Sequence, residues 1–316
     1  MSSATLMPLI MGMTQNKVVL VMGNGYDLNL NLATGYKDFI HSDEWKQMFH
    51  EYASKSHHYS LLKYLNDKAN LGNWFDMEQA LLDYADIRVK DVWPHDAEVD
   101  KREYSAICQA LKEYLDKHLR SRSGDIQSNY SVKILRKFQH NRDLRKIYTF
   151  NYTSLEQISR VANILHMVPC THVHGSVDDT SIILGFETSR FETIMPEYSF
   201  MLKSSSPDYH SVGLELDMVD AGEVIIFGHS LNMIDAVYFE HYLQALSNDV
   251  QASRRLTIIT RDETSRQSIL NNLRKMELSV PKLFSRGNLE FILIEDIERN
   301  PLQKNRLEEL LRRIDI

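Results

Sequence analysis

The stretch that decides the fold is KVVLVMGNGYD, from Lys17 to Asp27. Its apolar run, 17–22, predicts a buried β-strand, because it is short, rich in valine and followed at once by a turn. Gly23 to Gly25 supply that turn, and a helix is predicted near 36–40. A strand, a glycine loop and a helix in this order predict the first unit of an α/β sheet.

Further β-rich runs follow along the chain, most of them separated by segments of helix length. They are Lys146–Phe150, Thr171–His174, Ile182–Leu184, Val224–Phe227, Leu256–Thr260 and Phe291–Ile294. This alternation predicts a Rossmann-type α/β fold with a mostly parallel sheet.

Residues 42–139 show helical spacing instead, and they predict a helical insertion. The expected organisation is an N-terminal tail over 1–16 and a single domain over 17–316 that carries this insertion.

The amino-acid composition indicates which kinds of partner and which cellular compartment to expect. The 36 Lys and Arg residues are outnumbered by 43 Asp and Glu residues, and the net charge of −7 disfavours nucleic acid as a partner. Cys108 and Cys170 are too few for a disulfide framework or a four-cysteine zinc site. Val18–Met22 is too short to cross a bilayer, and Met1–Met13 has no basic flank. A cytoplasmic protein without a membrane partner is expected.

Candidate site residues lie where the predicted strands end, because ligands bind beyond the carboxyl ends of parallel strands. The Gly23 and Gly25 loop would let its backbone approach a phosphate. A turn alone explains these glycines equally well, and a helix cap explains Asn151 equally well. The polar clusters at the strand ends are Gly23-Asn24-Gly25-Tyr26-Asp27, Asn151-Tyr152-Thr153, His172-Val173-His174-Gly175-Ser176 and Gly228-His229-Ser230-Leu231.

In this order the clusters resemble the abortive-infection family AbiH, and the resemblance covers about residues 17 to 260. The matching stretches are Gly23 to Leu28; Tyr36, Asp38 and Phe39; Trp74, Asp76 and Glu78; Thr149 to Thr153 with Leu155 and Glu156; His172 to Gly175; and Gly228 to Leu231 with Asp235. The resemblance implies a role in antiphage defence, with an activity that is restrained until an unidentified phage or cellular trigger releases it.

A more distant resemblance is to the sirtuin-like superfamily of NAD-binding domains. Gly23 and Gly25 are similar to its Gly-Ala-Gly loop, Asn151 to the Asn of Thr-Gln-Asn-x-Asp, and His174 to the His of its His-Gly pair. Gly228, Ser230 and Leu231 are similar to its Gly-Thr-Ser-Leu segment. The chain departs from that pattern at Thr153, where sirtuins have Asp, and it lacks the paired Cys-x-x-Cys zinc module. The resemblance implies NAD as substrate or ligand. The expected binding residues are Gly23, Asn24, Gly25, Asp27, Gly228, Ser230 and Leu231.

Asn151 and His174 are the expected catalytic residues of an NAD glycohydrolase. Nicotinamide leaves as a neutral pyridine, so the reaction needs a positioned water and a base rather than a general acid. An amide can orient the water or the ribose, and a histidine can accept the proton. Asp27, in preference to Asp235, is expected to stabilise positive charge on the ribose.

Other functions remain open on the sequence. His172, His174, His229 and Asp235 could bind zinc, although the His-x-His pair has no third ligand nearby and no metal is expected. Gly228-His229-Ser230-Leu231-Asn232 is similar to a nucleophile elbow, but the last histidine is His241, too early for a hydrolase triad. A protein without enzymatic activity could bind NAD or ADP-ribose and signal to a partner through the helical insertion. The oligomeric state, including a homo-oligomer, is left open.

Overall fold

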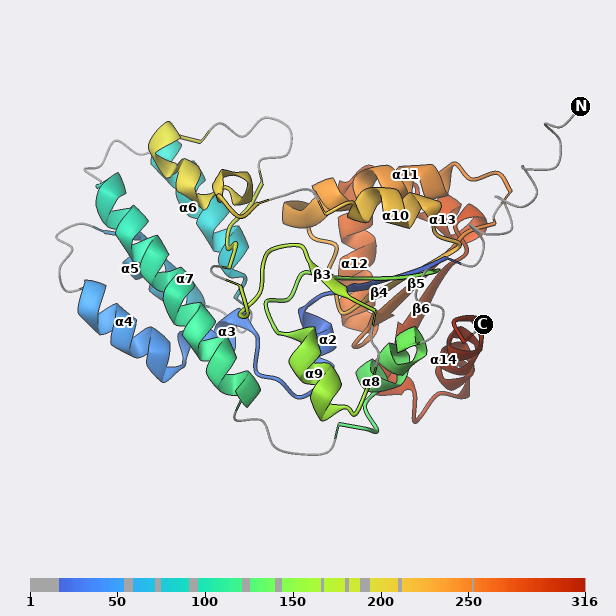
Figure 1. Cartoon of the computed structure of the whole chain (residues 1–316). Helices are drawn as coiled ribbons and strands as arrows, with labels where there is room; N and C mark the ends of the chain where they lie inside the picture. The colour runs from blue at the N-terminus through green and yellow to red at the C-terminus, as the bar shows by residue number, and fades with distance from the viewer. Residues whose placement is uncertain are drawn as a thin grey trace, which may run out of the picture.

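The computed structural model describes most of the chain (Figure 1). The described residues are 17–53, 59–71, 75–90, 96–120, 126–139, 144–165, 168–179, 182–187, 194–209, 212–251 and 253–315. The predicted tail 1–16 and Trp74 lie outside them.

A single parallel sheet of six strands forms the centre of the described structure, in the order β3-β2-β1-β4-β5-β6. The predicted α/β fold with a mostly parallel sheet is therefore confirmed. The strands are β1 (Val18–Met22), β2 (Arg145–Thr149), β3 (Cys170–His172), β4 (Glu223–Phe227), β5 (Arg255–Thr260) and β6 (Leu289–Leu293).

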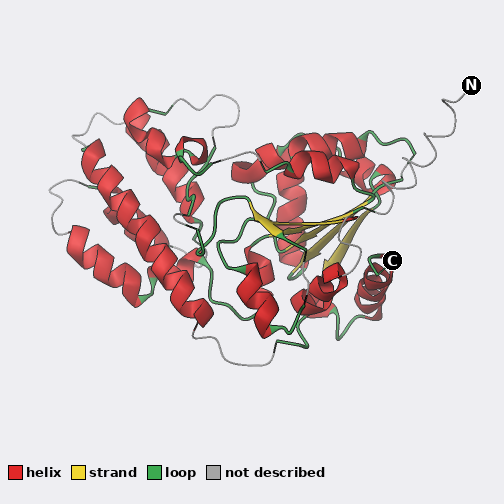
Figure 2. Ribbon diagram, viewed as in Figure 1, coloured by secondary structure: helices red, strands yellow, loops and turns green. Residues whose placement is uncertain are grey.

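The strands are apolar because helices cover both faces of the sheet. All of β1 is buried, and its residues alternate between two cores. One face packs against α10 (Leu214–Asp220), α11 (Glu240–Ser247), α12 (Glu263–Lys275) and α13 (Val280–Arg286). The other packs against α2 (Asn24–Asn29), α8 (Tyr130–Arg136), α9 (Leu155–Val161) and α14 (Pro301–Arg313). Figure 2 shows this arrangement of helices around the strands.

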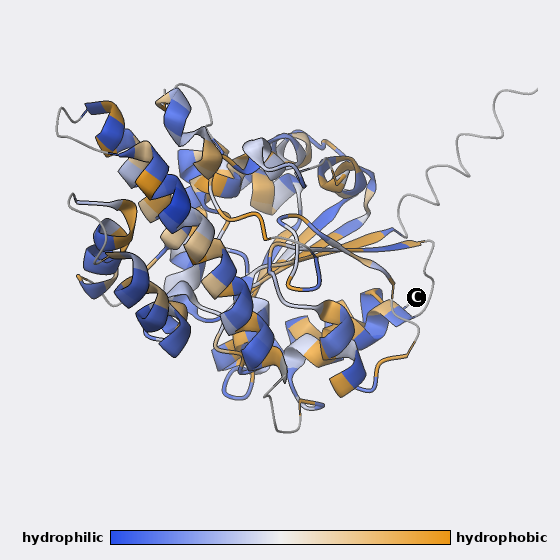
Figure 3. Cartoon of the chain, turned by 60° about the vertical axis from the view of Figure 1, so that its left-hand side comes forward, coloured by the Kyte–Doolittle hydropathy of each residue, from blue (hydrophilic) through white to orange (hydrophobic). Residues whose placement is uncertain are grey.

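A third core belongs to a helical cap beside the sheet. The cap contains α3 (Tyr36–Ile40), α4 (Asp43–Ala53), α5 (Leu61–Asn70), α6 (Met77–Lys90), α7 (Ala97–Arg120) and the 3₁₀ helix η3 (Pro196–Met201). Figure 3 shows that its helices carry both hydrophobic and hydrophilic residues, as expected of helices with one buried face.

Residues from after β3 join this cap through a buried carboxylate. Asp100 accepts a hydrogen bond from the Leu61 amide at 2.8 Å and from the hydroxyls of Tyr84 at 2.7 Å and Tyr198 at 2.8 Å. The Tyr198 bond fixes η3 to helices that come about 100 positions earlier in the chain. The cap is therefore built from two segments, one before β2 and one after β3.

Three details differ from the sequence-based expectations. Ile182–Leu184 is not a strand of the sheet: Ile182 makes an isolated bridge to Gly175, and Leu184 is buried in the cap core. The strand predicted at 171–174 ends at His172. Helix α8 lies within the predicted insertion but packs on the sheet, because its buried side chains belong to the sheet core.

In the part of the chain that the structure describes, no helix has both the length and the apolar character needed to cross a membrane.

Candidate functional site

The switch point of the sheet lies at β1, which pairs with β2 on one side and β4 on the other. After β1 the chain enters α2 on one face, and after β4 it reaches α11 on the opposite face. In such sheets, a ligand crevice usually forms between two neighbouring strands whose following connections run to opposite faces of the sheet. The Gly23 and Gly228 loops meet at this point.

The glycines of these loops allow the two backbones to touch. The Gly25 amide donates to the Gly228 carbonyl at 2.9 Å, and the Gly23 amide donates to the Phe227 carbonyl at 2.9 Å. A Cβ on Gly25 would lie 2.7 Å from the Gly228 Cα. Gly228 also has a φ of +68°, which favours glycine. Contact between the loops thus accounts for these glycines, and the amides of Gly23 and Gly25 are already engaged within the protein.

Asn151 and Asp27 join the loops after β1 and β2. The Asn151 Nδ2 donates to the Gly23 carbonyl at 3.1 Å, and the side chain is 8% exposed. Thr153 donates its hydroxyl to Asp27 Oδ2 at 2.7 Å. Asn24 Oδ1 accepts a hydrogen bond from Thr34 at 2.6 Å. These amide and carboxylate groups hold the loops in place.

His174 follows β3 and is 3% exposed. Its carbonyl accepts the Ile183 amide at 2.8 Å, and its ring packs edge-on against Phe150 at 5.1 Å between centroids. The buried Nε2 has no hydrogen-bond partner in the part of the chain that the structure describes. Burial, followed by the positive charge of Lys203, holds the pKa of His174 well below its usual value. The imidazole is therefore neutral at neutral pH and can accept a proton.

His229 has a fixed orientation beside Asp235. Its Nδ1 accepts the Leu231 amide at 3.0 Å, so the ring proton lies on Nε2, which is 3.3 Å from Asp235 Oδ2. Leu231 adopts a positive φ of 49° and buries its side chain in the sheet core. Ser230 is exposed, and its carbonyl accepts from Asn272 at 3.0 Å. The side chain of Leu231 thus faces the core.

Asp235 belongs to a group of buried ionisable side chains where the cap meets the sheet. Lys203, in the 3₁₀ helix η4 (Lys203–Ser205), is fully buried, and its Nζ lies 3.1 Å from Asp235 Oδ1 and 3.2 Å from Glu78 Oε1. His174 Nε2 is 3.9 Å from the same Asp235 oxygen. We call Glu78, His174, Lys203, His229 and Asp235 the buried charge cluster.

The pKa values in the buried charge cluster move in opposite directions. Burial raises the pKa of Glu78 to about 8, although Lys203 opposes the rise. Burial would also raise the pKa of Asp235, but Lys203 and the hydrogen bond from His229 lower it well below its usual value. Lys203 stays charged, because its two carboxyl neighbours outweigh the burial that lowers its pKa. One ammonium thus faces one carboxylate and one neutral acid, which is an electrically balanced arrangement.

The structure places the predicted site residues in two groups. Gly23, Gly25, Asp27, Asn151 and Gly228 lie in the joined loops. His174 lies in the buried charge cluster, beside Asp235 rather than Asp27.

Lys203 has no role in the sequence-based expectations, and Glu78 enters them only through the family resemblance. A lone lysine after Phe200-Met201-Leu202 gives no pattern from which burial could be predicted.

His172 and His174 have different partners. His172 Nδ1 lies 3.1 Å from the Asn151 carbonyl oxygen, whereas His174 Nε2 faces Asp235. Among the described residues no group of three or more His, Cys, Asp or Glu side chains is arranged to hold a metal ion.

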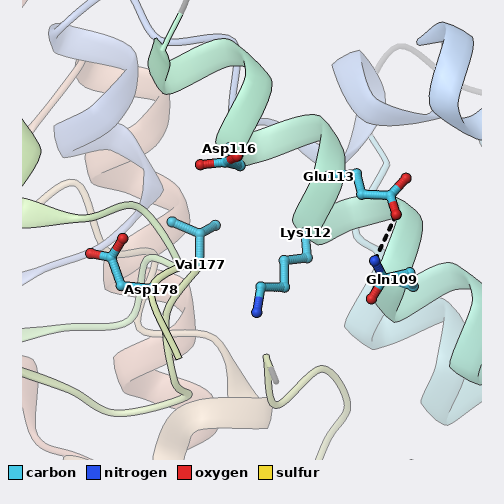
Figure 4. A pocket seen from close by; sticks show the side chains of 6 residues that line it. All are labelled: Gln109, Lys112, Glu113, Asp116, Val177 and Asp178. Atoms are coloured by element: carbon cyan, nitrogen blue, oxygen red, sulfur yellow. Dashed lines mark hydrogen bonds between the residues drawn. The ribbon is translucent and has the colours of Figure 1, made fainter. Parts of the chain in front are cut away.

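A surface hollow of about 420 Å³ lies between α7 and the loop after β3 (Figure 4). Three carboxylates and one ammonium line it, so it would repel a pyrophosphate. Its lining residues are Gln109, Lys112, Glu113, Asp116, Val177 and Asp178.

Comparison with known proteins identifies the family. No curated protein matches the chain. Residues 19–258 match the family described as bacteriophage abortive infection AbiH. The match begins in β1 and extends into β5, so it includes both glycine loops, all elements of the cap and the whole buried charge cluster. It spans well over half of the chain, and the protein therefore belongs to the AbiH family.

Proposed function

We propose that this protein acts in abortive infection by hydrolysing NAD at the bond between nicotinamide and ribose. Membership of the AbiH family suggests the defence role. The activity, the ligand and the relation to sirtuin-like domains are our inference. The observation that carries it is the buried Nε2 of His174, which makes no hydrogen bond with the described residues and lies beside an ionised carboxylate at the cap–sheet boundary.

The topology of the sheet supports a dinucleotide as the ligand. The order β3-β2-β1-β4-β5-β6 is that of dinucleotide-binding doubly wound sheets, which bind across the switch point. The similarity of Gly23, Asn151, His174 and Gly228 to sirtuin motifs supports NAD in particular. The engaged amides of Gly23 and Gly25 leave the phosphate contacts to other groups or to a rearranged loop.

The proposed reaction has one proton to place. Water forms a bond to C1′ of the ribose, and the bond from C1′ to nicotinamide breaks with its electron pair on the pyridine nitrogen. The water proton passes to His174 Nε2, and Asp235 stabilises the resulting imidazolium. Asn151 orients the water or a ribose hydroxyl. The products are ADP-ribose, nicotinamide and a proton.

The buried state of these residues supports an enzyme under restraint. Asn151, His174 and Asp235 are each less than 10% exposed. Entry of NAD therefore requires the cap to separate from the sheet. An abortive-infection enzyme must stay inactive until infection, because continuous loss of NAD would kill the host.

The test uses infected cells, where the trigger is present. Bacteria that express the wild-type protein would be infected with phages that the protein restricts, and their NAD would be followed over time. We expect NAD to fall in wild-type cells and His174→Ala to reduce the rate at least about 100-fold, the usual contribution of a base. Calorimetry should show NAD binding to the variant within a few-fold of wild type.

His172→Ala is the matched control, since it removes an imidazole that faces Asn151 instead of Asp235. It should reduce the rate far less than His174→Ala. Defence that persists in the His174→Ala strain while NAD stays constant would contradict the proposal. Binding of NAD or ADP-ribose in that case would favour the sensor function instead.

A further inference from the structure

Backbone contacts fix the position of Lys203, independently of the charge on its side chain. Its amide donates to the Phe186 carbonyl at 3.0 Å, and Gly185 makes room for this crossing because a Cβ there would lie 2.1 Å from the Met201 carbonyl oxygen. The ammonium is then fully buried between Glu78 of the cap and Asp235, which follows β4. Burying such a cation is costly, and apolar side chains of the same volume often give greater stability. A purely structural role explains this lysine poorly.

Asp235 has two oxygens and three basic neighbours. His229 donates its Nε2 proton towards Oδ2 at 3.3 Å. Lys203 takes Oδ1 at 3.1 Å, and His174 Nε2 remains 3.9 Å from that oxygen. Lys203 and His229 thus lie closer to the carboxylate than His174 does, and among the described residues His174 Nε2 has no hydrogen-bond partner.

We propose that Lys203 is a positioning residue that occupies Asp235 Oδ1 and so keeps His174 Nε2 available as the proton acceptor. This inference rests on the proposed function, in which His174 is the base. Lys203 reaches the site from the cap side, so the arrangement is complete only when the cap is docked on the sheet.

The charge of Lys203 also favours an unprotonated His174. Burial lowers the pKa of His174 most, Lys203 and His229 lower it further, and Asp235 raises it. Removing the ammonium should let His174 hold a proton and bond to Asp235. The titratable groups that face His174, directly or through Lys203, are Glu78, Lys203, His229, Asp235 and Tyr238.

The first test needs only the wild-type protein and no substrate. Imidazole nitrogen NMR, with the His174 signals assigned by their loss in His174→Ala, reports which ring nitrogen carries the proton. We expect an unprotonated Nε2 at pH 7 and titration below pH 6.5. An Nε2 proton shared with Asp235 at pH 7 would overturn the proposal.

The second test substitutes the lysine. In Lys203→Met we expect the His174 titration to move up by at least about one pH unit and its Nε2 to become protonated. The turnover number should fall about tenfold or more while the KM changes little, since the base is misplaced but the ligand contacts remain. Lys46→Met, at an exposed lysine of the cap, is the control and should change neither.

A failure of Lys203→Met to fold can be distinguished from a failure of the proposal. If Lys203→Met does not fold, Glu78→Gln/Lys203→Met removes the acid left without its cation, and the same shift is expected. A folded variant with unchanged His174 signals would mean that Lys203 only pairs charges, against the proposal. NMR results as expected in a protein that never cleaves NAD would contradict the proposed function but leave the arrangement of Lys203, Asp235 and His174 intact.

Discussion

The joined glycine loops and the buried charge cluster lie at the same end of the sheet but are built differently. In the loops, backbone donors meet backbone acceptors, and Gly25 and Gly228 touch because neither has a Cβ. In the cluster, side chains from positions as distant as Glu78 and Asp235 share a few buried charges. The loops are a satisfied structural joint, whereas the cluster keeps an unsatisfied base.

This difference separates residues that form the crevice from residues that can do chemistry in it. A satisfied backbone joint gains little from a ligand, since its donors are already in use. A buried imidazole nitrogen without a partner is a cost that function can explain. Substitutions in the two regions should therefore fail in different ways.

The largest loss of stability is expected in the loops. Gly228→Ala would place a Cβ 2.3 Å from the Tyr26 nitrogen at a φ of +68°, so overlap and backbone strain both apply. We expect the free energy of unfolding to fall by about 4 kcal/mol. Gly213→Ala is the matched control, because its φ of +71° is similar but its nearest neighbour is 4.0 Å away. Strain alone should cost it about 1–2 kcal/mol. Equal losses in urea unfolding would show that the loops are not a tight joint.

A smaller loss is expected when the carboxylate of the cluster is removed. Asp235→Asn should cost about 3 kcal/mol, the low end for a broken buried pair, since Glu78 can ionise in its place. Glu78→Gln should cost less than about 1 kcal/mol, because it replaces a neutral acid with a neutral amide that can still accept from Lys203. Urea unfolding at pH 7 measures both. If Glu78→Gln were the more damaging variant, the assignment of charge within the cluster would be reversed.

The last effect is the dependence of stability on pH, which is spread over several pH units. The pKa of Glu78 is about 8 when folded and 4.5 as its ordinary value, so between these values the folded protein binds more protons than the unfolded one. The stability that the folded protein gains from protonated Glu78 is fully present below about pH 4.5. It is lost as pH rises through 8, by at most about 1.4 kcal/mol per pH unit.

Unfolding of the wild type and Glu78→Gln across pH 5 to 8 isolates the Glu78 contribution. The stability of the wild type relative to the variant should decline as pH rises. His174 acts in the opposite sense, losing stability as pH falls below 6.5, but it is present in both proteins and cancels in the difference. Parallel curves would show that Glu78 is ionised when folded.

Much of the sheet could be predicted, because buried parallel strands are short apolar runs that end at turns. Val18–Met22 and Val224–Phe227 are of this kind. Ile182–Leu184 has the same composition, but it packs in the cap, where an apolar segment needs no neighbouring strand. Local composition predicts that a segment is buried, but it does not predict in which core its side chains pack.

The site could be predicted only in part. Glycines and histidines at strand ends can be predicted as site residues because each lies beside a turn in the sequence. Lys203 cannot be predicted in this way, since its burial depends on Glu78 and Asp235, which the tertiary fold brings to it. A buried ion pair depends on two distant positions at once, and neither one carries a local signal.

The place of β1 at the centre of the sheet also affects how the chain can fold during synthesis. Val18 pairs with Arg145 and with Glu223, so neither neighbour of β1 exists until long after it has left the ribosome. At about 5–20 residues per second, the first neighbour arrives roughly ten seconds later. Meanwhile the cap helices α4 and α7 can pack through contacts within their own segment. We therefore expect the apolar VVLVM segment to stay unpaired for this time and to expose nascent chains to aggregation and to capture by chaperones.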